Sequence, residues 1–256
     1  MEDPGASARL RTAMVWIGWD PGEMEACTVA LWSIVATSRS LKWVSRRLAL
    51  AELCAKGLYW RQTDRRGGRL WDMISDAPMS TEHAISRFFV PYLSDFTGWA
   101  LFVDGDVLFR ADVADLFALA DPQYAVQVVQ HPPLLKEGVK KDGAAQLAYP
   151  RKNWSSVMLF NCGHPANRAL TLDTLNTWPG RDLHAFRWLG NDQIGALPAR
   201  WNHLVNVNPP CADPALVHFT EGVPLLPDHA RDPFADEWFR IATSAGYRFP
   251  APAVRI

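Results

Sequence analysis

The sequence lacks the features that mark several protein classes. Its four cysteines, at positions 27, 54, 162 and 211, are far apart and form no Cys-x-x-Cys pair, so neither a zinc site nor a disulfide framework is indicated. Reduced thiols are typical of the cytoplasm, and we expect a cytoplasmic protein. Acidic and basic residues nearly cancel to a formal net charge of -1, which gives no indication of an overall polyanion-binding surface.

Long apolar runs are also missing. The run that follows residues 1–11 is interrupted by Asp20, so it is too short for a signal peptide or a membrane span. We expect residues 1–12 to be a flexible tail and the chain 1–256 to form a single domain with no transmembrane segment. The sequence contains neither Gly-x-Gly-x-x-Gly nor a Walker loop after its first apolar segment, which argues against dinucleotide and P-loop sites.

The most informative stretch runs from Leu101 to Phe109. It carries two acids one residue apart, Asp104 and Asp106, inside an apolar run typical of a buried parallel strand. Ionised carboxylates in apolar surroundings are costly unless they are paired, hydrogen-bonded or bound to a cation. A strand that stops at Asp104, turns at Gly105 and resumes after Asp106 would place both carboxylates in a crevice, where a hard divalent cation fits.

The N-terminal part of the chain predicts an open α/β sheet. Residues 14–20 read as a strand, the turn at 20–22 follows, and residues 23–37 have helical character. In such sheets, ligands bind outside the carboxyl ends of the strands. Gly18 and Asp20 would lie at that end of the first strand.

The remaining elements follow from periodicity and turn signals. We expect strands near 41–44, 124–130, 154–163 and 216–220, helices over 48–56, 80–94, 112–117, 165–178 and 232–245, a charged surface loop at 64–69 and a long loop at 132–150. Loops of the last kind are often functional, and the role of the segment 132–152 is open.

Four further positions have both a structural and a functional interpretation. Arg87 is either a surface residue or, if its helix packs beside the acidic turn, a phosphate ligand. Asn161 ends a strand and is expected at the same edge of the sheet as the carboxylates. The pair at 192–193 is explained as helix capping by Asn191 or Asp192, and a lone histidine such as His218 in a strand is usually a core residue.

The order of these motifs resembles that of retaining GT-A glycosyltransferases of the glycogenin and lipopolysaccharide galactosyltransferase family (family 8). The resemblance covers about residues 14–225. The matching motifs, in chain order, are Gly18 with Asp20, Arg87, Asp104-Gly105-Asp106, Asn161 with Gly163, Asp192-Gln193, and His218 with Gly222 and Pro224.

The resemblance implies a single-domain GT-A fold, an α/β architecture with a Rossmann-like mixed sheet flanked by helices. It implies that Asp104, Asp106 and His218 bind Mn²⁺ or Mg²⁺, which holds the diphosphate of a nucleotide sugar. The implied donor is a UDP-sugar, contacted by residues that include Gly18, Asp20, Arg87, Asp104, Gly105, Asn161 and Gly222.

The resemblance also assigns catalytic roles. Arg87 would assist the departure of the diphosphate as a second cation. Asp192 or Gln193 would stabilise the sugar ring or position the acceptor, and because a carboxamide is a poor nucleophile, we expect front-face displacement with retention. A saccharide, a lipid-linked glycan, a protein and a modified nucleobase are all compatible acceptors. The sequence determines neither the acceptor nor the oligomeric state.

The sequence departs from the family pattern after His218. The family has His-x-x-Gly-x-x-Lys-Pro there, whereas residues 218–224 read His-Phe-Thr-Glu-Gly-Val-Pro without a lysine. Lys136, Lys141 or Arg151 could contact phosphate instead. Two alternatives stay open: a nucleotidyltransferase, which would be expected to have a Gly-rich basic loop after the first strand, and a non-catalytic nucleotide-sugar binding protein.

Overall fold

The computed structural model describes residues 13–39, 43–132, 138–139, 145–146, 151 and 153–248. The expected tail at 1–12 and most of the loop at 132–150 lie outside the described residues. Among the residues that are described, no helix is both long and apolar enough to cross a lipid bilayer.

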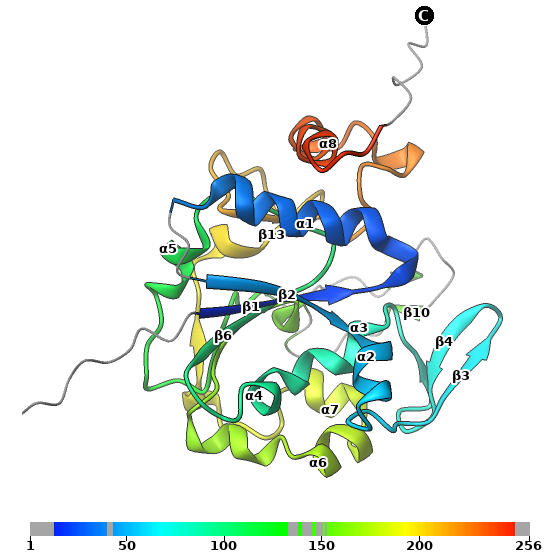
Figure 1. The fold of residues 1–256 in the computed structure, drawn as a ribbon, viewed down its shortest axis with the longest axis vertical. Helices are drawn as coiled ribbons and strands as arrows, with labels where there is room; N and C mark the ends of the chain where they lie inside the picture. The colour runs from blue at the N-terminus through cyan, green and yellow to red at the C-terminus, as the bar shows by residue number, and fades with distance from the viewer. Residues whose placement is uncertain are drawn as a thin grey trace, which may run out of the picture.

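A six-stranded mixed sheet forms the centre of the fold (Figure 1). Its strands, in spatial order, are β12 (Ile194–Ala196), β8 (Val126–Val128), β11 (Val157–Asn161), β6 (Trp99–Val103), β1 (Ala13–Trp19) and β2 (Trp43–Ala49). Strand β1 runs parallel to β2 and β6, whereas β11 runs antiparallel to both of its neighbours. The predicted mixed sheet flanked by helices is confirmed.

The central strands are apolar runs because the sheet is covered on both faces. Successive side chains of β6 point to opposite faces: Phe102 joins one buried cluster, while Leu101 and Val103 join another. The second cluster includes Ile34 of α1 (Met24–Thr37). Figure 1 shows α1 and α8 (Ala235–Ser244) on one side of the sheet.

The other face of the sheet carries a set of short helices. These are α3 (His83–Ser86), α4 (Val90–Leu93), α6 (Leu172–Thr177) and α7 (Gly180–His184), with η2 (Arg87–Phe89) joining α3 to α4. The helix expected over 165–178 is interrupted. It consists of η4 (Pro165–Ala169) and α6, because Leu170 and Thr171 leave the helical conformation and Thr171 caps α6 through the backbone N–H of Thr174.

A second, smaller sheet receives the chain after the acidic turn. It contains β13 (His203–Leu204), β14 (Leu216–His218) and β7 (Val107–Phe109), in that order. The run 101–109 therefore stops at Asp104 and resumes at Val107 as predicted, but it resumes in a different sheet. This change of sheet places Asp104 and Asp106 between the two.

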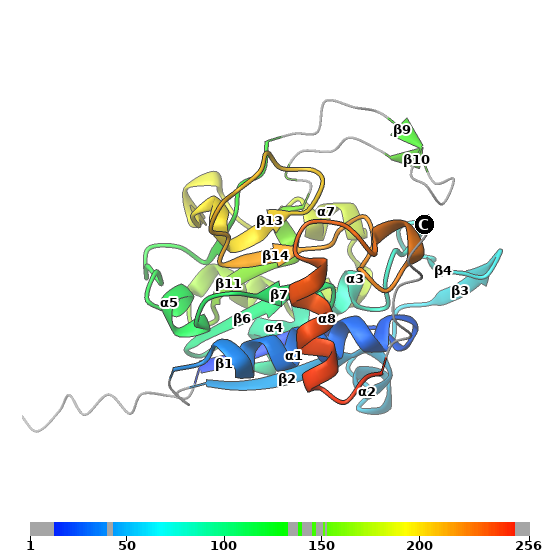
Figure 2. The same cartoon turned by 90° about the horizontal axis from the view of Figure 1, so that it is seen from above.

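The charged segment 64–69 is a hairpin rather than the expected loop. Strands β3 (Thr63–Arg66) and β4 (Arg69–Asp72) pair antiparallel, and β5 (Ala77–Pro78) adds to β4. Gly67 and Gly68 both have positive φ, as a two-residue hairpin turn requires. The hairpin extends away from the body of the protein (Figure 2).

The other described elements are short. They are α2 (Leu50–Ala55), α5 (Val113–Phe117), β9 (Gly138–Val139), β10 (Ala145–Gln146), η1 (Pro21–Glu23), η3 (Trp154–Ser156), η5 (Asn191–Gln193), η6 (Ala199–Asn202) and η7 (Pro227–His229). The strand expected at 41–44 is longer, since β2 extends to Ala49, and the helix expected from 48 begins at Leu50.

Candidate active site

The acidic turn between β6 and β7 is packed tightly against the end of β1. A Cβ atom on Gly105 would lie 2.5 Å from the Sγ of Cys27 and 2.6 Å from the carbonyl oxygen of Gly18. Any side chain at position 105 would therefore displace the turn. Glycine here allows the chain to turn between two carboxylates directly above β1 and α1.

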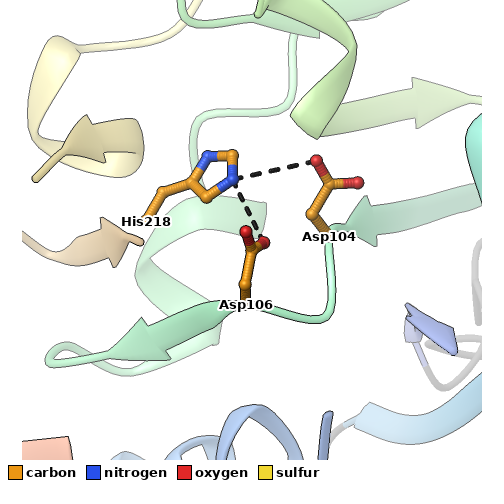
Figure 3. A group of neighbouring side chains, drawn as sticks. All are labelled: Asp104, Asp106 and His218. Atoms are coloured by element: carbon orange, nitrogen blue, oxygen red, sulfur yellow. Dashed lines mark ion pairs between the residues drawn. The ribbon is translucent and has the colours of Figure 1, made fainter. Parts of the chain in front are cut away.

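Asp104 and Asp106 of the acidic turn converge with His218 of β14, and Figure 3 shows their side chains pointing toward one another. The Nε2 of His218 lies 3.1 Å from an oxygen of Asp106 and 3.8 Å from an oxygen of Asp104. One potential ligand atom from each residue lies within 4.8 Å of the other two. His218 reaches this position because β14 pairs with β7, which places His218 opposite Val107.

The three side chains differ in burial and stabilise one another's charge. His218 is 4% exposed, Asp104 15% and Asp106 22%. Burial lowers the pKa of His218, but the negative charge and hydrogen bond of Asp106 outweigh it and hold the pKa above its ordinary value. Burial raises the pKa of Asp104, and the positive charge of Arg87 outweighs that effect, so this carboxyl has a pKa well below its usual range.

Arg87 lies behind Asp104 and is buried. Its Nη2 is 2.9 Å from Oδ1 of Asp104, its Nη1 donates to the carbonyl of Ser155 and its Nε donates to the carbonyl of His83. The guanidinium also lies over the ring of Phe102. These contacts engage all three guanidinium nitrogens within the protein, and one of them contacts Asp104. A contact between Arg87 and the donor diphosphate stays a prediction.

His83 is a second residue that holds Asp104, and sequence reasoning missed it. Its Nε2 lies 3.3 Å from the same Oδ1, and its ring is almost fully buried beneath Gly18, where a Cβ would lie 2.5 Å from the imidazole. His83 precedes Arg87 by four residues, so the two share one helical face. That spacing was the available signal.

A polar wall formed by residues 155, 156 and 202 was also missed. The carbonyl of Ser156 accepts a hydrogen bond from the backbone N–H of Asp104 at 2.9 Å. Asn202 contacts Nδ1 of His218 at 3.2 Å. The hydroxyl of Ser155 pairs with His184, whose pKa burial lowers to about 3. These side chains come from distant segments without a motif.

The end of β1 lies next to the site. One carboxylate oxygen of Asp20 accepts from the N–H of Gly22, and the other accepts from the N–H of Glu82 at 2.9 Å. Asp20 therefore ties the end of β1 to the helical segment that carries Arg87. Glu23, on the following turn, has its pKa raised to about 7 by desolvation and by the negative charges of Asp106, Asp20 and Asp104.

Gly222 lies in the segment that follows β14. Its φ of +147° and the imidazole of His229, which a Cβ would approach to 2.6 Å, both exclude a side chain. His229 is held by Asp232 through a 2.7 Å contact. The backbone of Gly222 therefore packs directly against the imidazole of His229, at the position where the family pattern has its glycine.

Asn161 does not lie with the carboxylates, and the expectation that it shares their edge of the sheet is wrong. Strand β11 runs antiparallel to β6, so Asn161 pairs with Trp99 at the start of β6, whereas Asp104 follows its end. The Asn161 side chain donates to the carbonyl of Pro122. The sequence does not reveal strand direction, and a parallel strand had been assumed.

The pair Asp192-Gln193 occupies η5. The carbonyl of Gln193 accepts from the N–H of Ala125, and its side chain accepts from the N–H of Gly190, which caps the turn in place of Asn191 or Asp192. Because β8 runs in the same direction as β6, its start and this backbone lie beside Asn161, at the opposite edge of the sheet from Asp104 and Asp106. The structure therefore does not bring this pair together with the carboxylates, as the predicted contact with the donor sugar requires.

The donor set fits a divalent cation of the Mn²⁺ or Mg²⁺ type. Two carboxylates supply hard oxygen ligands, and an imidazole nitrogen is a common ligand of Mn²⁺. Both carboxylates stay partly open to solvent, so water or phosphate oxygens can complete the coordination. Among the described residues, Asp104, Asp106 and His218 are the group of acidic, histidine or cysteine side chains that lie close enough together to share a metal ion.

Comparison with known proteins identifies relatives at two levels. No protein-family model matches the chain. Protein CDI of Arabidopsis thaliana is 41% identical over 237 residues, which cover 91% of this chain and 86% of that protein.

Solved structures supply the fold. The galactosyltransferase LgtC, in complex with donor and acceptor sugar analogues, superimposes with a TM-score of 0.55 at 14% identity, covering 93% of this chain and 98% of LgtC. The bifunctional glycosyltransferase WbbM gives 0.54 at 13% identity, and the chain covers about half (53%) of its length. GlyE of Streptococcus pneumoniae gives 0.53 at 16% identity. These likenesses confirm the predicted GT-A fold.

Proposed function

The chain belongs to the same protein family as Protein CDI of Arabidopsis thaliana, and we propose that it is a metal-dependent glycosyltransferase that moves a sugar from a nucleotide-sugar donor to an acceptor. The observation that carries the proposal is the convergence of Asp104, Asp106 and His218 on a GT-A fold. An acidic turn at the edge of such a sheet has no evident structural need for two adjacent carboxylates. A cation held between them and the donor diphosphate explains their presence.

The three residues have distinct roles in the proposed reaction. Asp104 and Asp106 supply negative charge and oxygen ligands, and His218 supplies one nitrogen ligand. A divalent cation bound there would offset the diphosphate charge and stabilise the leaving nucleoside diphosphate. Arg87 and His83 hold one oxygen of Asp104, so the other oxygen faces His218 and Asp106.

The donor side of the site follows from the same edge of the sheet. The ends of β1 and β6 meet there: Gly105 packs against the carbonyl of Gly18, and Asp20 follows β1. Gly222, in the segment after β14, is proposed to contact the donor as well. We assign the donor to the UDP-sugars because the family resemblance does so. Retention at the anomeric carbon is proposed on the same basis.

Nucleotide binding tests the proposal directly. Calorimetric titration of UDP, GDP and CDP, each with and without Mn²⁺, compares the wild type with Asp106→Asn. Asp115→Asn is the matched control, since Asp115 is an aspartate of α5 paired with Arg39 outside the site. We expect UDP to bind when Mn²⁺ is present, in the wild type and in the control but not in Asp106→Asn.

The products then separate the remaining functions. Incubation with UDP-sugars and Mn²⁺ is expected to release UDP, and NMR of the anomeric proton of the glycosylated product is expected to show retention. Absence of nucleotide binding under every metal condition would overturn the transferase. Binding without turnover of any donor would make the chain a nucleotide-sugar binding protein, and release of pyrophosphate from a nucleoside triphosphate would make it a nucleotidyltransferase.

A further inference from the structure

A buried hydrogen-bond chain lies behind His218. Asn202, at the end of η6, is fully buried, and Ser156 is 4% exposed. Oδ1 of Asn202 lies 3.2 Å from Nδ1 of His218, and its Nδ2 lies 2.9 Å from the hydroxyl oxygen of Ser156. The Ser156 hydroxyl lies 2.8 Å from the carbonyl of Asn153. Every group on this path is polar and enclosed, so each needs a partner.

The chain has one consistent set of donors and acceptors. A backbone carbonyl accepts only, so the Ser156 hydroxyl donates to Asn153 and its oxygen is left to accept. Nδ2 of Asn202 fills that acceptor and also approaches the carbonyl of Asn153 at 3.5 Å. Flipping the amide would place Oδ1 against these acceptors. Oδ1 therefore faces His218 and accepts a hydrogen bond from the Nδ1–H group.

This orientation decides which nitrogen of His218 is available. A hydrogen on Nδ1 leaves Nε2 of the neutral imidazole with its lone pair, and Nε2 is the atom that points at Asp104 and Asp106. A lone pair aimed at two carboxylates is unfavourable unless a proton or a cation lies between them. In metal sites, the second nitrogen of a ligating histidine is usually held in this way.

We propose that Asn202 is a positioning residue for the metal site: by accepting from Nδ1, it fixes the tautomer and ring orientation in which Nε2 of His218 is presented to a cation bound by Asp104 and Asp106. The inference rests on the proposed metal-dependent function.

Ser156 couples this effect to the acidic turn. Its carbonyl accepts from the backbone N–H of Asp104 while its hydroxyl accepts from Asn202. One residue thus joins the segment that carries a carboxylate to the residue that orients the imidazole. Hydrogen bonds through Ser156 and Asn202 thus connect the acidic turn to His218.

The chain contains a matched control for a purely structural asparagine. Asn167 is also fully buried, its Nδ2 donates to the carbonyls of Ala125 and Asn161 at 2.8 Å, and its Oδ1 accepts from Trp188 at 3.1 Å. It lies beside Asn161, at the opposite edge of the sheet from Asp104. Replacing either asparagine removes a comparable number of buried hydrogen bonds.

The experiment measures Mn²⁺ affinity from the loss of the free-ion EPR signal during titration with the metal alone. For Asn202→Leu we expect affinity about 10- to 100-fold weaker, the usual effect of losing such a partner. For Asn167→Leu we expect the affinity of the wild type together with a lowered melting temperature. Asn202→Asp keeps an acceptor for Nδ1, so it should retain most of the Mn²⁺ affinity even though it loses the donor to Ser156.

A second measurement is made on the wild-type protein. In wild-type protein at a pH where the imidazole is neutral, ¹⁵N-edited NMR should show the His218 proton on Nδ1, with His218→Asn serving to assign the signal. A proton on Nε2 would overturn the inference, as would Mn²⁺ affinity in Asn202→Leu equal to that of the wild type. If the wild type itself binds no Mn²⁺, the metal-dependent function is wrong and this inference falls with it.

Discussion

Arg61 and Arg87 are buried arginines that each pair with an aspartate, but the two pairs are completed differently. Arg61 contacts both oxygens of Asp72, at 3.0 and 2.6 Å, and its third nitrogen donates to the carbonyls of Leu175 and Trp178. Asp72 also accepts from the backbone N–H of Ser75. Every oxygen of this carboxylate has a partner within the protein, so the pair links the hairpin to α6.

Asp104 is only half satisfied by comparison. Arg87 and His83 both contact its Oδ1, whereas Oδ2 faces the imidazole of His218 at 3.8 Å. Burial raises the pKa of Asp72, and hydrogen bonds from Arg61 and Ser75 outweigh it. For Asp104, burial is outweighed first by the charge of Arg87. Both carboxylates stay ionised, but one is closed by hydrogen bonds and the other keeps an oxygen for a further cation.

The difference shows how a fold separates a stabilising ion pair from a binding one. When every carboxylate oxygen of a buried ion pair has a partner, removing either residue strongly lowers the free energy of unfolding. A carboxylate with one oxygen directed at a second acid and an imidazole gains more from a divalent cation than from its protein neighbours. The following predictions test this distinction.

The largest effects are expected from replacing one aspartate of each region, Asp106 at the metal site and Asp72 in the Arg61 pair, by asparagine. Asp106→Asn should abolish Mn²⁺ binding and lower transferase activity at least about 100-fold, since a metal contributes several kcal/mol to the stabilisation of developing charge. Asp72→Asn should leave Mn²⁺ affinity unchanged but lower the free energy of unfolding by about 3 kcal/mol or more, because it strands a buried arginine. Metal titration and denaturant unfolding of both variants measure the two effects.

These outcomes form a double dissociation. Loss of metal binding in Asp72→Asn with the fold intact would mean that the Arg61–Asp72 ion pair also affects the geometry of the metal site. Unchanged metal binding in Asp106→Asn would remove Asp106 from the ligand set.

The next effect concerns the arginines. Arg61→Met should lower the free energy of unfolding by about 3–5 kcal/mol, because Asp72 is left buried without its partner. Arg87→Met should cost less, about 1–3 kcal/mol, since Asp104 keeps His83 and some solvent.

Added Mn²⁺ distinguishes the two arginine variants. At one fixed Mn²⁺ concentration, the metal should stabilise Arg87→Met more than it stabilises the wild type, because Asp104 without its arginine should bind the cation more tightly. It should add no more to Arg61→Met than to the wild type. Equal costs for both substitutions would contradict the distinction between the pairs.

How much of this could be predicted from the sequence depends on which residues carry the signal. The apolar runs of β1, β6 and β11 were predicted because both faces of the sheet are buried. The hairpin was missed because every residue of β3, Thr63–Arg66, is exposed, which leaves no alternation to detect. The end of β2 was misplaced for a similar reason, since Arg46 and Arg47 are exposed.

The site shows the same division. Asp104 and Asp106 were found from local chemistry, whereas His218 became a candidate only through the family resemblance. Asn202 acts through contacts between segments far apart in sequence, for which a single sequence contains no signal, whereas the spacing of His83 from Arg87 was a signal that went unused. Asn161 was placed at the wrong edge because strand direction depends on the sheet as a whole.

A smaller, pH-dependent effect is expected in the metal-free protein. Burial lowers the pKa of His218 in the folded state, but the negative charge of Asp106 outweighs burial and raises the pKa above its ordinary value. Its protonation therefore stabilises the fold fully below the unfolded pKa of about 6.5, and this contribution is lost as the pH rises through the higher folded pKa. Denaturant unfolding between pH 6 and 9 (roughly the range concerned) should show this loss. The loss should be smaller in Asp106→Asn, and an equal loss in both proteins would contradict the assignment.

The smallest effect is expected at Glu23, which reports the charge of the site without belonging to the ligand set. Desolvation and the negative charges of Asp106, Asp20 and Asp104 raise its pKa to about 7 in the metal-free protein. A divalent cation between Asp104 and Asp106 would cancel part of that negative potential, so the midpoint should move down toward 4.5 when Mg²⁺ is added. Asp106→Asn should lower it without metal, because one of the repelling charges is gone. The midpoint is measured from the carboxyl ¹³C shift of Glu23, assigned with Glu23→Gln. A midpoint that responds to Asp106→Asn but not to Mg²⁺ would mean that the cation does not occupy the space between the two carboxylates.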